Sequence, residues 1–93
     1  MKIKKKILVT HWDHNIKPEI FTIKGKTEKR LILDVYYNSD RIVNALGEND
    51  EFINEVWNAE LSKKELMEKI PFETLDDFLS DLNEKSEYNF SIY

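Results

Sequence analysis

Apolar and polar residues alternate along the first third of the chain, which is the pattern of β-strands with one buried face. Residues 2–12 alternate in this way, and the β-rich runs EIFTIK (19–24) and RLILDVYY (30–37) follow. The short segment between the last two runs contains Gly25 and suits a hairpin. The pattern therefore predicts an N-terminal three-stranded antiparallel sheet.

Beyond the third predicted strand, apolar residues recur every three or four positions, which is the period of an α-helix. Ser39 can cap a short helix over 40–46, because its hydroxyl can accept a hydrogen bond from the first turn. Asn49 or Asp50 can cap a second helix, whose apolar stripe includes Trp57. We therefore expect the Trp57 side chain to be largely buried.

The sequence LSKKEL carries the strongest local helix signal of the chain. Ser62 and Glu65 have the spacing of a capping box, in which each side chain bonds to the backbone of the other residue. This third helix should end before Pro71, because proline disfavours helical geometry in the residue that precedes it. Thr74 can then cap a fourth helix, whose apolar stripe places Phe78 in the core.

The C-terminal residues YNFSIY (88–93) alternate and could add a short strand to the edge of the sheet. A chain of 93 residues is long enough for one modest core. We expect one α+β domain over residues 1–93, in which helices of the C-terminal half cover one face of the N-terminal sheet.

Composition excludes several classes of protein. The chain has no cysteine, so it has no disulfide bonds, thiolate nucleophiles or thiolate metal sites. The apolar run after the first lysines, 7–9, is too short for a signal peptide, and no segment approaches the roughly 20 apolar residues of a membrane span. Richness in Lys, Glu, Ile and Asn fits an AT-rich bacterial or phage genome. We expect a protein of the bacterial cytoplasm.

Charge is distributed unevenly along the chain. Residues 1–30 contain nine Lys and Arg against three Asp and Glu, whereas residues 31–93 contain five against fifteen. The N-terminal lysines could touch phosphate, but Trp12 is the one aromatic residue interleaved with them. We therefore expect an acidic surface that binds a basic protein, and no direct contact with nucleic acid.

The acidic residues gather on the predicted fourth helix. Glu73, Asp77, Asp81 and Glu84 lie three or four residues apart, so they share the outward side of the helix, and Asp76 lies beside them. Four residues rise about 6 Å along a helix, which makes this row a sparse imitation of the phosphates on a nucleic-acid strand. The predicted partner-binding residues are Glu73, Asp76, Asp77, Asp81 and Glu84, with Glu48, Asp50, Glu51 and Glu55 as possible neighbours.

Both histidines lie in the stretch HWDH (11–14), at the end of the first predicted strand. His11 and Asp13 project to the same side of an extended strand, and His14 could fold back toward them. The three side chains could hold a structural zinc ion, which prefers four nitrogen or oxygen ligands when no cysteine is present. Water, a second molecule or a carboxylate would complete the site, with Glu19, Asp34 and Asp40 as candidates.

The alternative for this stretch is a polar turn, in which the imidazoles bond locally and Asp13 forms an Asx turn. Signatures of catalysis are otherwise missing from the sequence. With two glycines the chain can form neither a P-loop nor a dinucleotide-binding fingerprint, and no second histidine cluster accompanies HWDH. We therefore expect a protein that is not an enzyme.

The chain resembles, in kind, the small acidic anti-CRISPR proteins that phages use against RNA-guided nucleases of type II systems. The resemblance rests on size, composition, the lack of cysteine, the strands with helices and the acids of ETLDDFLSD. It implies a non-enzymatic inhibitor that binds the CRISPR effector nuclease and blocks the loading of nucleic acid.

Two other classes fit the same features. An immunity protein that neutralises a bacterial toxin would also be small, acidic and cytoplasmic. A small metal-dependent enzyme would use HWDH in a cleft with a free coordination position. A neighbouring toxin gene would favour the first, and a metal with an open position would favour the second.

Overall fold

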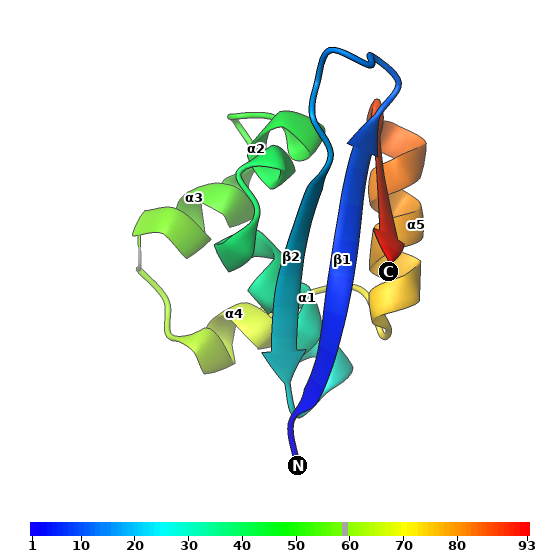
Figure 1. Ribbon diagram of the computed structural model, residues 1–93. Coiled ribbons are helices and arrows are strands. Elements are labelled where there is room, and N and C mark those ends of the chain that lie inside the picture. Colours follow the sequence, from blue (N-terminus) through cyan, green and yellow to red (C-terminus); the bar gives the residue numbers. More distant parts are fainter. Residues whose placement is uncertain (59) are drawn as a thin grey trace.

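The computed structural model describes residues 1–58 and 60–93, and this part of the chain forms three strands and five helices (Figure 1). The elements follow in the order β1 (Ile3–His11), β2 (Glu19–Gly25), α1 (Glu28–Asn38), α2 (Arg41–Leu46), α3 (Glu51–Asn58), α4 (Lys63–Lys69), α5 (Leu75–Lys85) and β3 (Tyr88–Ile92).

The three strands form one antiparallel sheet in the order β2-β1-β3. β1 is the central strand, and its Ile7 lies opposite Phe21 of β2 and Ile92 of β3. The predicted α+β class and the three-stranded antiparallel sheet are therefore confirmed. The alternation of YNFSIY correctly predicted that the C-terminus adds an edge strand.

The strand predicted over 30–37 is wrong, because these residues belong to helix α1. The Thr27 side chain accepts a hydrogen bond from the Arg30 N–H at 3.2 Å, which is a helix N-cap. Residues 31–36 are all buried. A continuous apolar run fits a strand or a helix that is buried all round, and periodicity alone does not separate the two. The segment GKTE contains the cap of this helix and no hairpin.

The helices cover one face of the sheet and leave the other face open (Figure 1). Ile7 and Val9 of β1, Ile23 of β2 and Phe90 of β3 point into the core beneath α1 and α5. The alternate positions of the strands, among them Lys4, face away from the helices. Within the described residues, no helix combines the length and apolar character that crossing a membrane requires.

Of the two helical residues that the sequence predicts to be buried, one is buried and the other is exposed. Phe78 is 1% exposed, as predicted, and lies on the inner side of α5. Trp57 is 46% exposed, so its predicted burial is wrong. Ile53 and Val56 form the buried side of α3, and Trp57 lies beside them in the last turn, which ends at Asn58.

The capping residues predicted for α3, α4 and α5 are in place, whereas the N-cap of α2 is Asp40 and not the predicted Ser39, which ends α1 and accepts the Arg41 N–H. Ser62 and Glu65 form the complete capping box of α4, and the Thr74 hydroxyl accepts the Asp77 N–H at the start of α5. Asp50 accepts the Ile53 N–H and so begins α3. These short-range bonds fix where each helix starts, which sets the positions of the acidic side chains that follow.

Side chains from the helices close both edges of the sheet. Asn83 of α5 donates to the Phe90 carbonyl at 2.9 Å and accepts the Phe90 N–H, so it bonds β3 as a neighbouring strand would. Asp34 of α1 accepts the Lys24 N–H of β2 at 2.9 Å. Backbone groups at an unprotected edge pair with other chains, and these two residues block that pairing.

Candidate protein-binding site

Helix α5 presents its acidic residues to solvent because its apolar residues occupy the opposite side. Leu75, Phe78, Leu79 and Leu82 are buried. Asp76 and Asp77 stand in the first turn, where negative charge is favoured by the partial positive charge of the helix N-terminus. The sequence therefore dictates that packing of the leucines turns the carboxylates outward.

The structure brings all five predicted partner-binding residues onto α5 or the segment before it. We call this set the acidic face, and it consists of Glu73, Asp76, Asp77, Asp81 and Glu84. Four of the five are exposed, and Asp81 is half-buried because its carboxylate pairs with Lys85 at 2.7 Å.

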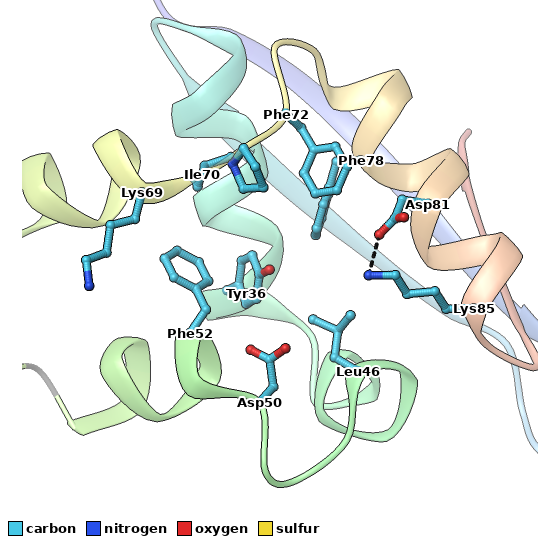
Figure 2. Close-up of a pocket in the computed structure, with 11 residues that line it drawn as sticks. Tyr36, Leu46, Asp50, Phe52, Lys69, Ile70, Phe72, Phe78, Asp81 and Lys85 are labelled. Atoms are coloured by element: carbon cyan, nitrogen blue, oxygen red, sulfur yellow. Dashed lines mark ion pairs between the residues drawn. The ribbon is translucent and has the colours of Figure 1, made fainter.

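A cavity of about 200 Å³ opens beside the acidic face, between the start of α3 and the side of α5 (Figure 2). We call it the aromatic hollow. Residues of α1, α2, α3 and α5 line it together with the end of α4 and the segment that follows. They are Tyr36, Leu46, Asp50, Phe52, Lys69, Ile70, Pro71, Phe72, Phe78, Asp81 and Lys85.

Aromatic rings make the wall of the aromatic hollow. The Tyr36 ring meets Phe52 edge-on at 4.7 Å between centroids, and it lies 5.5 Å from Phe78. Phe72 stands 5.5 Å from Phe78 on the other side. Aromatic pairs prefer such tilted and edge-on arrangements, so the rings hold one another in position. The hollow is therefore preformed.

The rim of the aromatic hollow carries two carboxylates and two ammonium groups (Figure 2). Lys69 is engaged by Glu55 at 2.8 Å, and this hydrogen bond raises the pKa of Lys69. Lys85 is engaged by Asp81. One oxygen of Asp50 accepts the Ile53 N–H, which leaves its second oxygen for another donor. The lysines of the rim are thus neutralised by carboxylates of the protein itself.

The carboxylates at the rim also affect the ionisation of the Tyr36 phenol in the wall. Burial, and then the carboxylates of Asp50 and Asp81, raise the pKa of Tyr36 well above its usual value. The phenol therefore stays neutral and can donate a hydrogen bond at any physiological pH. Figure 2 shows Asp50 next to the ring of Tyr36 and Asp81 across the hollow, on α5. An apolar wall beneath carboxylates is an environment that favours a long cationic side chain.

His11 ends β1, and the other residues of the histidine stretch form the turn that follows. His11 Nδ1 accepts the Asp13 N–H at 2.9 Å, which assigns the ring proton to Nε2, and Nε2 lies 3.4 Å from Glu87. Asp13 accepts the Asn15 N–H, so it forms an Asx turn. His14 is exposed. The local bonds match the polar-turn alternative.

No group of three His, Asp or Glu side chains stands ready to hold a metal ion in residues 1–58 and 60–93. Two proposed additional ligands have other partners: Glu19 pairs with Arg41 at 3.6 Å, and Asp34 bonds β2. A structural zinc at His11, Asp13 and His14 stays a prediction. Zinc added to metal-free protein, with the double variant His11→Ala, His14→Ala as control, tests it through the thermal midpoint.

Sequence reasoning missed the wall of the aromatic hollow. Tyr36 was assigned to a strand, and that error separated it from Phe52, Phe72 and Phe78. Asp50 was named as a neighbour of the acidic residues, and the structure does place it at the rim beside Asp81. Comparison with protein families, with curated proteins and with solved structures finds no match for this chain.

Proposed function

We propose that the protein is a non-enzymatic inhibitor that binds a basic surface of a nucleic-acid-binding protein, namely an RNA-guided CRISPR effector nuclease. The acidic face occupies the channel where guide or target phosphates would lie. Binding then blocks the loading of nucleic acid. The inhibitor acts in the cytoplasm of the bacterial host, where the nuclease works.

The observation that supports this proposal most is the aromatic hollow beside the acidic face. Strong protein interfaces depend on a few buried anchors surrounded by weaker contacts. A lysine or arginine of the partner would enter the hollow, lie along the rings, pair with the second oxygen of Asp50 and compete with Lys85 for Asp81. The exposed carboxylates of Asp76, Asp77 and Glu84 would steer the partner toward it.

Charge reversal tests the acidic face. The variant Asp76→Lys, Asp77→Lys, Asp81→Lys should abolish binding to a type II effector nuclease and restore DNA cleavage in an inhibition assay. A matched control carries Asp40→Lys, Glu60→Lys, Glu68→Lys, three exposed acids outside α5 with the same change in net charge. Equal binding by the α5 variant and wild type would disprove the proposal, provided that circular dichroism shows both variants folded.

Binding measurements at several salt concentrations separate steering from anchoring. Association with the nuclease should slow as ionic strength rises, because exposed charges are screened beyond about 8 Å at physiological salt. Phe52→Ala should instead speed dissociation, because it removes one wall of the aromatic hollow. A basic toxin domain assayed in parallel tests the immunity-protein alternative with the same variants.

A further inference from the structure

A second cavity, of about 370 Å³, lies where β2 ends, between the start of α1 and helix α4. We call it the basic pocket. Most of its lining residues come from the basic N-terminal third of the chain, and none of them also lines the aromatic hollow. Its lining residues are Lys2, Lys24, Gly25, Lys26, Thr27, Arg30, Asp34, Lys63 and Met67.

Five cationic residues from separate parts of the chain line the basic pocket, and the ammonium group of one of them, Lys63, lies over the Tyr37 ring at 5.7 Å from its centroid. Lys2 precedes β1, Lys24 lies in β2, Lys26 follows it, Arg30 lies in α1 and Lys63 begins α4. Like charges so close repel one another unless an anion lies between them. In a protein with a net charge of −4, this convergence stands out from the average surface.

One carboxylate, Asp34, also lines the pocket, but its oxygens are largely engaged. Oδ2 accepts the Lys24 N–H at 2.9 Å, and Oδ1 lies 3.8 Å from Arg30 Nη2. The Asp34 side chain is only 13% exposed. It therefore orients Arg30 while leaving the pocket strongly positive.

Arg30 is held in the basic pocket by the chain around it. Gly25 faces the Arg30 side chain so closely that a β-carbon at residue 25 would collide with it. The Arg30 side chain is 25% exposed, and its contact with Asp34 is longer than a hydrogen bond. Within the described residues, no hydrogen bond from its guanidinium group is formed. A half-buried guanidinium that forms no short hydrogen bond is prepared for an anionic ligand.

We propose that the basic pocket binds a phosphate group, carried by a nucleotide or by the end of a nucleic-acid strand. Arginine presents a planar fork that matches two phosphate oxygens, and the lysines supply point charges around it. The cavity volume lies at the lower end of the range of small-molecule sites. The N-terminus of α1 opens beside it and adds a partial positive charge.

Titration calorimetry with three probes tests the proposal and identifies the source of the phosphate. The probes are pyrophosphate, adenosine triphosphate, and a single-stranded oligonucleotide with and without a 5′-phosphate. We expect binding of at least one phosphate-bearing probe, weakened by salt, with citrate as a control for simple anion attraction. A requirement for the 5′-phosphate would identify a strand end. Absence of binding by all three probes, or equal binding by citrate, would overturn the proposal.

Two variants separate a built pocket from general positive charge. Gly25→Ala keeps the net charge but displaces Arg30, and Arg30→Lys keeps the charge but removes the fork. Each should weaken phosphate binding at least tenfold, because each removes or displaces a hydrogen bond between charged groups. Arg30→Lys decides the matter if Gly25→Ala does not fold.

Charge-changing variants provide the matched control. Lys63→Glu lies in the pocket, and Lys17→Glu makes the same change at an exposed lysine outside it. The first should weaken binding at least tenfold and the second by much less. Equal effects would show attraction to overall charge and no pocket. Reversal of Asp76, Asp77 and Asp81 should leave phosphate binding at least as strong, so this proposal stands or falls independently of the inhibitor function.

Discussion

The aromatic hollow and the basic pocket are built in opposite ways. The hollow has a wall of rings that belong to the hydrophobic core, Tyr36 and Phe78 among them, so its shape is inseparable from the stability of the fold. The pocket has a wall of exposed lysines around one arginine, which Gly25 and Asp34 hold in place. A surface that recognises a protein side chain relies on a fixed apolar shape, whereas one that binds a phosphate relies on positive charge around a guanidinium fork that is held in place.

The largest effect is expected where the hollow meets the core. Phe78→Ala should lower the free energy of unfolding by about 3–5 kcal/mol, because it removes a fully buried ring and leaves a cavity. Phe72→Ala, at a half-buried position of the same wall, should cost clearly less. Urea unfolding of both variants measures the difference. Similar costs would show that the wall is uniform and is not anchored at α5.

The aromatic wall also shows where sequence reasoning ends. Caps are local, so Ser62, Glu65 and Thr74 were identified from spacing alone, and the outward position of the acidic face followed from the leucines of α5. Tyr36 was misplaced because a run of buried apolar residues has no period. Trp57 was misplaced because its stripe continued into the last turn of α3, where the buried side is taken by Ile53 and Val56.

Neither cavity follows from local patterns. The aromatic hollow combines rings spread along the chain from Tyr36 to Phe78, and the basic pocket combines Lys2 with Lys63. Such convergence depends on how the helices pack on the sheet, and a one-dimensional pattern does not contain that information. The uneven charge was visible in the sequence, but its division into two separate cavities was not.

The next largest effect on the free energy of unfolding is expected at β3, the edge strand that Asn83 of α5 bonds. Asn83→Ala should destabilise the domain by about 1–3 kcal/mol, because the Phe90 N–H and carbonyl lose their partners in a partly buried place. The exposed Asn89 provides the control, and Asn89→Ala should change stability by less than about 0.5 kcal/mol. Urea unfolding compares them. Size-exclusion chromatography should also detect association of Asn83→Ala through the opened edge.

The pH dependence of stability tests the charge environment of the aromatic hollow. The pKa of Tyr36 is raised in the folded protein, so above the ordinary value of about 10 the unfolded chain loses a proton that the folded protein keeps. The unfolded state then binds fewer protons, and stability falls as pH rises, by up to about 1.4 kcal/mol per pH unit.

Tyr36→Phe should remove this part of the loss above pH 10. Other tyrosines and the lysines titrate in the same range, so the quantity to measure is the difference between the variant and wild type in urea unfolding from pH 8 to 11. Tyr37→Phe, at the half-buried neighbouring residue, is the control. Parallel curves for Tyr36→Phe and wild type would contradict the raised pKa.

The smallest effect on stability should accompany a gain in binding. Lys85→Ala removes the ion pair with Asp81 and a favourable positive charge in the last turn of α5. Pairs of this kind, one helical turn apart at the surface, contribute about 0.3–0.5 kcal/mol, so the variant should fold almost as stably as wild type. The carboxylate of Asp81 is then free to pair with a cationic side chain in the aromatic hollow. Binding to the effector nuclease should tighten, whereas Lys69→Ala, which frees Glu55 outside the hollow lining, should change it less. Weaker binding of Lys85→Ala would mean that Lys85 itself contacts the partner, and that the hollow does not receive a cation.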